Sequence, residues 1–123
     1  MKQKTCAIVV RSLTADKEYI KKGIDLALYK GCTRFLCGLE PDTGLTAAEY
    51  VLSCRSPARA ITLECVIPFE EYTTLWDERS RDRFFEILRR CDTETMLQRH
   101  YTKDCIERQR CYLLRQSDET IVL

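Results

Sequence analysis

Short apolar runs alternate with longer segments of helical periodicity along nearly the whole of this 123-residue chain. The first run, at residues 4–11, has the sequence KTCAIVVR and is rich in β-branched side chains, which is typical of a strand buried on both faces of a parallel sheet. Strands that alternate with helices favour right-handed strand–helix–strand units. We therefore expect a three-layer α/β fold, in which a mostly parallel sheet of about four to five strands has helices on both faces.

The other expected elements follow from where each pattern begins and ends. Apolar residues recur at helical spacing from Asp16 to Lys30, and Gly31 follows in the position where glycine commonly ends a helix. A further helix is expected after Trp76, with Phe84 facing inward. This order of elements predicts a Rossmann-like fold. The remaining elements are expected as strands at residues 33–38, 61–68 and 119–123, a weakly extended segment at residues 92–97, and helices from Ala47 and after Thr102.

The segment at residues 33–52 has the pattern of a strand, a loop with two glycines and an amphipathic helix. Thr46 and Glu49 have the spacing of a capping box, which predicts a helix that begins at Ala47 and a loop at residues 39–45. In α/β proteins, small ligands usually bind beyond the carboxyl end of a strand, opposite the free N–H groups of the next helix. This loop is therefore the first place to look for a functional site.

Composition limits the class of protein. With 45% hydrophobic and 32% charged residues, residues 1–123 are expected to form one domain. The formal net charge of +1 gives no overall attraction to nucleic acid. The sequence has neither an apolar run of about 18 residues nor the features of a signal peptide. We expect a cytoplasmic protein that neither spans a membrane nor binds nucleic acid.

The eight cysteines are scattered through apolar segments, without a C-x-x-C pair. The single histidine, His100, lies five residues from the nearest cysteine, Cys105. That separation does not decide for or against a catalytic thiol. Neither a metal nor another cofactor is expected, and the cysteines are interpreted as reduced, buried side chains.

Three stretches of the chain resemble the SLOG superfamily, in particular its YpsA-like bacterial branch: GLEPDTGLTAAEYVL, VIPFEEYTTLW and HYTKDCIERQRCYLLRQSDETIVL. The resemblance covers nearly all of the chain and implies a Rossmann-like sheet with a ligand loop of the type GGA-x-G-x-D-x-x-AAE after the second strand. The positions that match family positions are Gly38, Ala47, Ala48, Glu49, Pro68, Trp76, Tyr101, Cys105, Tyr112, Ser117 and Asp118.

The chain departs from the family pattern in the loop. Leu39 stands where the family has its second glycine, and Asp42 and Gly44 stand where it has glycine and aspartate. Gln109 and Arg110 replace an arginine–asparagine pair. These departures imply a weakened phosphate site, since a backbone without the second glycine approaches a ligand less closely.

Charge at the loop leads to the same expectation. Glu40, Asp42 and Glu49 crowd the N-terminus of the second helix and compete with a phosphate for its positive end. A nucleobase edge or a ribose hydroxyl suits this site better than a triphosphate. Arg108 and Arg110 could supply countercharge from the last helix if they lie on one side of it, or they could be ordinary surface arginines.

We expect a non-catalytic module that binds or senses a nucleotide-derived ligand, with no catalytic residue assigned. One alternative is a nucleotide-processing hydrolase of the N-glycosidase or phosphoribohydrolase type, and another is a scaffold that has lost its ligand and serves as a protein-interaction domain. The aromatic candidates could stack on a base or plug the edge of the core. The candidate ligand-binding residues are Gly38, Glu40, Asp42, Gly44, Thr46, Glu49, Pro68, Trp76, Tyr101 and Arg108.

A homodimer is also expected. Family members continue past the segment that matches ETIVL, so this chain is expected to leave an apolar strip and a strand edge uncovered, which favours pairing with a second copy. The candidate contact residues are Ile121 and Leu123, with Tyr112 or Leu114 from the preceding helix.

Overall fold

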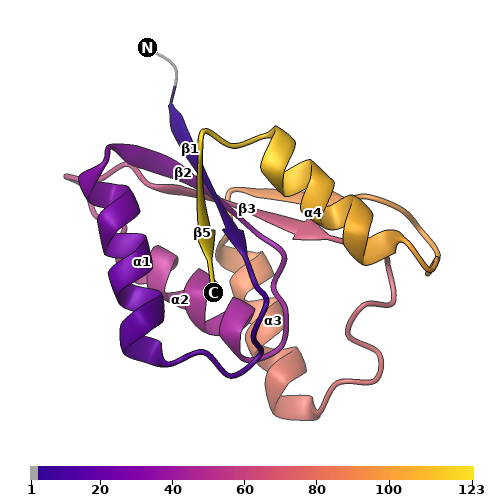
Figure 1. Ribbon diagram of the computed structural model, residues 1–123. Helices are drawn as coiled ribbons and strands as arrows, with labels where there is room; N and C mark the ends of the chain where they lie inside the picture. Colours follow the sequence, from indigo (N-terminus) through magenta and orange to yellow (C-terminus); the bar gives the residue numbers. More distant parts are fainter. Residues whose placement is uncertain (1–2) are drawn as a thin grey trace.

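The computed structural model describes residues 3–123, which form one sheet with helices on both faces (Figure 1). The strand order is β4-β3-β2-β1-β5, and every neighbouring pair is parallel. The expected three-layer, Rossmann-like α/β fold is therefore confirmed. The elements are β1 (Lys4–Val9), α1 (Lys17–Tyr29), β2 (Cys32–Cys37), α2 (Thr43–Ser53), β3 (Thr62–Ile67), α3 (Glu78–Arg90), β4 (Thr93–Met96), α4 (Cys105–Arg115) and β5 (Glu119–Val122).

The three layers enclose two apolar cores of unequal size. Helices α1, α2 and α3 cover one face of the sheet, and α4 covers the other (Figure 1). The larger core lies on the three-helix side and includes Ile24, Phe35 and Val51, all fully buried. Ala7, Leu36, Val66 and Leu113 form the smaller core beneath α4. Because successive strand residues point to opposite faces, burial of both faces explains the unbroken apolar runs in the sequence.

Two helices begin at aspartate caps. The Asp16 side chain accepts a hydrogen bond from the Glu18 N–H (3.4 Å) at the start of α1, and Asp77 accepts one from the Ser80 N–H (2.8 Å) at the start of α3. Helix α1 ends before Gly31, whose φ of +95° is a conformation that glycine adopts without strain. The expected bounds of this first helix are confirmed.

The predicted start of the second helix is wrong. Helix α2 begins at Thr43 rather than Ala47, because Asp42 turns the chain with a φ of +61° and its carbonyl oxygen accepts a hydrogen bond from the Thr46 N–H (2.8 Å). Thr46 and Glu49 are thus inside the helix, where no capping box can form. The loop after β2 is shorter than predicted and ends at Asp42.

The cysteines behave mainly as small apolar side chains. All eight are free, five are buried, and only Cys111 is exposed. Burial raises the pKa of the Cys6 thiol to about 12, so this thiol stays protonated at neutral pH. Within residues 3–123, no helix has the length and apolar character needed to cross a membrane.

Candidate functional site

The carboxyl ends of β2 and β3 are tied to α4 by one buried side chain. Gln109 donates from Nε2 to the carbonyl oxygens of Gly38 (3.1 Å) and Val66 (2.8 Å). Gln109 is only 1% exposed, so these bonds form out of contact with water. Helix α4 therefore holds the loop that begins at Gly38 in place.

Two glycines make room for the side chain of Glu40. A Cβ atom on Gly38 would lie 2.5 Å from Gln109 Nε2 and 2.9 Å from Glu40 Oε2. A Cβ atom on Gly44 would lie 2.7 Å from Glu40 Oε1. Side-chain carbons do not approach other atoms this closely, so the carboxyl group of Glu40 occupies space that only glycine at both positions leaves open.

Two acceptor atoms at this loop are buried without a partner. Among the residues that the structure describes, neither Glu40 Oε1 nor Gln109 Oε1 accepts a hydrogen bond. Burial raises the pKa of Glu40 from 4.5 to about 7, although the nearby charge of Arg110 lowers it. Glu64, also buried, is by contrast well paired, since it accepts from Arg34, Thr95 and Tyr112.

The loop between β2 and α2 has an unusual backbone. Leu39 has a φ of +54° and Asp42 a φ of +61°, in a region that side chains other than glycine rarely adopt. Leu39 thus keeps a backbone conformation typical of glycine, while its side chain is fully buried in the larger core. That side chain does not stand at the mouth of the loop.

The helices that border Glu40 lack side-chain caps. Asp42 and Asp104 occupy the N-cap positions of α2 and α4, and neither side chain accepts a cap hydrogen bond. This differs from the aspartate caps of α1 and α3. The positive ends of α2 and α4 are thus left to other groups at the carboxyl edge of the sheet.

Thr46 and Glu49 face a hollow beside the loop. Arg83 of α3 donates to both carboxylate oxygens of Glu49 (3.1 and 2.6 Å) and to Thr46 Oγ1 (3.1 Å). The hollow has a volume of about 720 Å³ and is also lined by Asp42 and Lys21. Glu49 is therefore paired with Arg83, and this ion pair joins α2 to α3.

The aromatic candidates belong to a cluster between β3 and α3. Trp76 packs edge-to-face on Tyr72 and Phe84, with 5.1 Å and 5.6 Å between the ring centroids, and it lies against the larger core. Tyr101 is exposed and packs edge-to-face on Phe69 (5.5 Å). Trp76 thus plugs the core edge, whereas the ring of Tyr101 is open to solvent.

Arg108 lies apart from the loop. It forms an ion pair with Asp104 (2.8 Å) along the exposed surface of α4 and lines a separate hollow with Arg115. Arg110 is the arginine near the loop, since its charge lowers the pKa of Glu40. Its Nη2 donates to the carbonyl oxygen of Val10 (3.3 Å), which follows β1.

The predicted site residues therefore fall into distinct groups. Gly38, Glu40 and Gly44 form one cluster with Gln109, which we call the Glu40 cluster. Asp42, Thr46 and Glu49 line the neighbouring hollow. Pro68 is buried directly after β3, and Trp76 and Tyr101 belong to the aromatic cluster. Arg108 lies apart from all of these groups.

Gln109 was not among the predicted site residues. Its signal in the sequence is its spacing, because Cys105, Gln109 and Leu113 recur every four residues and all three are buried. A polar residue on the buried stripe of a helix requires a hydrogen-bond partner. The partnership of Arg83 with Glu49 has no comparable local signal.

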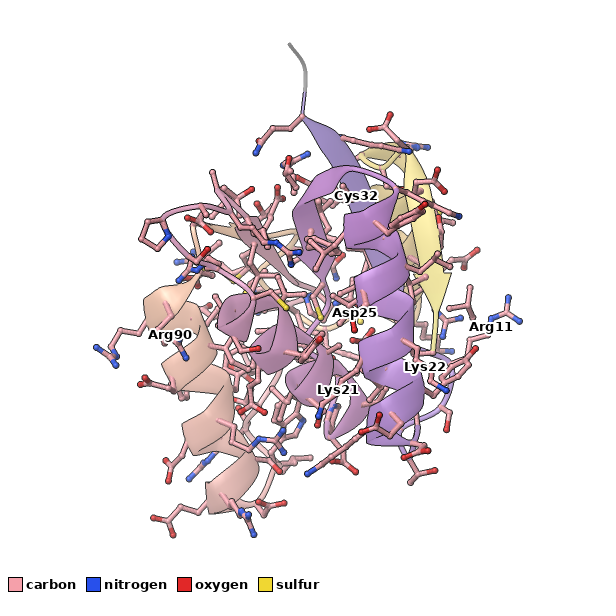
Figure 2. The ribbon with its side chains drawn as sticks, turned by 90° about the vertical axis from the view of Figure 1, so that its left-hand side faces the viewer. Arg11, Lys21, Lys22, Asp25, Cys32 and Arg90 are labelled. Atoms are coloured by element: carbon pink, nitrogen blue, oxygen red, sulfur yellow. The ribbon has the colours of Figure 1, made fainter. Side chains whose placement is uncertain are left out.

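An apolar groove of about 370 Å³ runs between α1 and β5, away from the Glu40 cluster. Gly23 allows the close packing of α1 on Ile121, since a Cβ atom there would lie 3.0 Å from Ile121 Cγ2. Figure 2 shows Lys22 on the side of α1 that faces β5, at the groove, and Lys21 on the side that faces α2.

The parallel sheet, with a glycine-bearing loop between β2 and α2 at its carboxyl edge, defines a Rossmann-like α/β protein. Residues 11–123 match the model of the YspA SLOG family, and the chain belongs to this family. It is 28% identical over 115 residues to a UPF0398 protein of Halalkalibacterium halodurans. That alignment covers 92% of this chain and 61% of the relative, so the chain spans less than two thirds of the relative's length. The resemblance found in the sequence is confirmed.

Proposed function

We propose that this protein is a non-catalytic module that binds a nucleotide-derived small ligand at the carboxyl edge of the sheet. The observation that carries the proposal is the pair of buried, unpaired acceptors, Glu40 Oε1 and Gln109 Oε1, in the Glu40 cluster. A buried polar atom without a partner costs about 1–3 kcal/mol. A ligand that donates hydrogen bonds to both acceptors offsets this cost.

The chemistry of the surroundings favours a nucleoside-like molecule. Nucleobase amino groups and ribose hydroxyls are donors of the kind that these two acceptors need. The aromatic cluster borders the Glu40 cluster, because the pKa of Tyr72 is raised mainly by burial and also by the charge of Glu40. Phe69 joins Tyr72 to Tyr101, whose exposed ring offers a face on which a base can stack. Such a combination of a few polar groups with aromatic surface is typical of small-ligand sites.

A specific observation supports the rival hypothesis of a nucleotide-processing hydrolase. Burial raises the pKa of Glu40 to about 7, and a carboxyl group with such a pKa can exchange a proton at neutral pH. Within residues 3–123, however, Glu40 is hydrogen-bonded to no nucleophilic side chain. Binding without turnover is therefore the better-supported function.

Thermal melting with a panel of nucleobases, ribonucleosides and their monophosphates tests the proposal. A compound that binds only the folded state raises the melting temperature of the wild type. We expect the same increase in Glu86→Gln, a change on the exposed surface of α3, and a smaller one in Glu40→Gln. No free base should appear on chromatography. The absence of any increase across the panel contradicts the proposal, and base release that is lost in Glu40→Gln supports the hydrolase.

A further inference from the structure

We propose that the carboxyl group of Glu40, which lies beside the first turn of α2, keeps an anion away from the N-terminus of that helix, so that the ligand is a nucleoside or nucleobase and not its phosphate. The choice of ligand class rests on the function proposed above. The exclusion of phosphate rests on contacts within the Glu40 cluster and can be tested separately.

The position of the carboxyl group is the first argument. Gly44 lies in the first turn of α2, and Glu40 Oε1 is 2.7 Å from where its Cβ atom would be. In loops that bind phosphate, glycines let the backbone approach the anion at a helix N-terminus. Here the glycines at 38 and 44 border a carboxyl group that belongs to the chain itself.

The amide groups of α2 supply the second argument. The N–H of Leu45 donates to the carbonyl oxygen of Glu40 (3.1 Å), and that of Thr46 donates to Asp42 (2.8 Å). Within the described part of the chain, the N–H groups of Thr43 and Gly44 have no paired acceptor. A helix end with free N–H groups attracts an anion. The carboxyl group of Glu40 lies beside this helix end, although its Oε1 atom accepts a hydrogen bond from neither N–H group.

The state of the carboxyl group is the third argument. A carboxylate with a purely structural role is paired, as Glu64 is with Arg34 and Tyr112. Glu40 Oε1 is buried and unpaired, and its pKa of about 7 leaves it partly ionised at neutral pH. A phosphate at the same helix end would meet this group at short range, where like charges repel strongly.

Removal of the Glu40 side chain should therefore create a phosphate site. We expect millimolar inorganic phosphate to raise the melting temperature of Glu40→Ala by several degrees, but not that of the wild type, at matched ionic strength. Asp42→Asn is the matched control, because it removes a carboxylate from the same helix end without emptying the space beside Gly44. Circular dichroism checks that each variant is folded. A response of the wild type equal to that of Glu40→Ala, the same gain in Asp42→Asn, or no gain in Glu40→Ala overturns the proposal.

A second arm tests the ligand class. The wild type should bind a nucleoside at least about tenfold more tightly than its monophosphate, and Glu40→Ala should lose or reverse this preference. Tighter binding of the monophosphate by the wild type overturns the inference but leaves the proposed function intact. If no nucleoside or nucleotide binds the wild type, the proposed function fails, and with it the ligand class inferred here. Even in that case, the phosphate experiment on Glu40→Ala tests by itself whether the Glu40 carboxyl group keeps an anion away from the N-terminus of α2.

Discussion

Gln109 on α4 and Gly38 at the end of β2 are joined by a buried hydrogen bond of 3.1 Å between residues 71 positions apart in the sequence. The same side chain also binds the Val66 carbonyl. Gln109→Ala should lower the free energy of unfolding by about 2–4 kcal/mol, because it removes both bonds and leaves a cavity. Urea unfolding measures this change. Gln116→Ala, on the exposed end of α4, should alter the stability by less than about 0.5 kcal/mol, and equal effects of the two variants contradict the role of Gln109.

The positive φ of Asp42 predicts a stabilising substitution. Asp42→Gly should raise the free energy of unfolding by roughly 1 kcal/mol, because glycine adopts this backbone conformation without strain. Gly31→Ala is the converse control. It should destabilise by a similar amount through its φ of +95° alone, since an added Cβ atom there would meet no atom within 4 Å. Thermal and urea unfolding measure both changes. If Asp42→Gly is less stable than the wild type, the claim that the backbone of Asp42 is strained is wrong.

The pair of Glu49 with Arg83 should contribute to stability by joining α2 to α3. A double-mutant cycle with Glu49→Gln and Arg83→Met should give a coupling energy of about 1 kcal/mol, because both side chains are only partly exposed and the contact is bidentate. The pair of Glu86 and Arg89 on the exposed surface of α3 should give a smaller coupling energy, because solvent screens its charges. A coupling for Glu49 and Arg83 that is no larger would show that the pair does not hold the helices together.

Glu40 predicts a pH dependence of stability. Its pKa rises from 4.5 in the unfolded chain to about 7 in the fold, so the folded protein keeps a proton that the unfolded chain releases. The stabilisation is fully present below pH 4.5 and is lost as the pH rises through about 7, a change on the order of 3 kcal/mol. Unfolding at about pH 5 and about pH 8 should show this loss in the wild type and a smaller one in Glu40→Gln. Identical pH dependence of the two proteins contradicts the raised pKa.

We propose that the homodimer expected from the sequence forms through β5, which is an outer strand of the described sheet. The Val122 carbonyl oxygen faces outward, where it accepts a bond from the exposed Tyr19 hydroxyl (3.3 Å). Val122 and Leu26 are exposed beside it. The Leu123 side chain, an expected contact, is instead buried in the core, so Val122 takes its place.

Light scattering tests this assembly. The wild type should have the mass of a dimer at micromolar concentration, and Val122→Asp should have that of a monomer, because a carboxylate cannot be buried unpaired in an apolar contact. Phe85→Asp, which alters an exposed apolar residue near the β4 edge, should remain dimeric. A monomeric wild type contradicts the proposal.

Much of the fold was predictable because local patterns determine it. Apolar runs predicted β1, β2, β3 and β5. The first three strands have buried residues, whereas β5 has only half-buried and exposed ones and is followed by the buried Leu123. The edge strand β4 gave a weak signal, since most of its side chains are exposed and need not be apolar.

The start of α2 could not be predicted, for a physical reason. Thr46 and Glu49 have the spacing of a capping box, but their partner is Arg83, whose side chain comes from 34 residues beyond Glu49. The turn that begins the helix depends on a positive φ at Asp42, which an aspartate does not signal in the way that glycine does.

The candidate site was predictable in location but not in composition. Because small ligands usually bind at the carboxyl edge of a parallel sheet, the sequence indicated the loop after β2 as the candidate site. The contact between Glu40, Gly38 and Gln109 depends on how α4 crosses the opposite face of the sheet, which no local pattern encodes.

Nuclear magnetic resonance of the isotope-labelled protein, titrated with the nucleoside that raises its melting temperature most, tests the central claim most directly. We predict that the largest shifts occur at the backbone amides of residues 38–46 and at the side-chain amide of Gln109. Shifts concentrated instead around Tyr19, Leu26 and Val122, in the groove between α1 and β5, would contradict a ligand site at the Glu40 cluster.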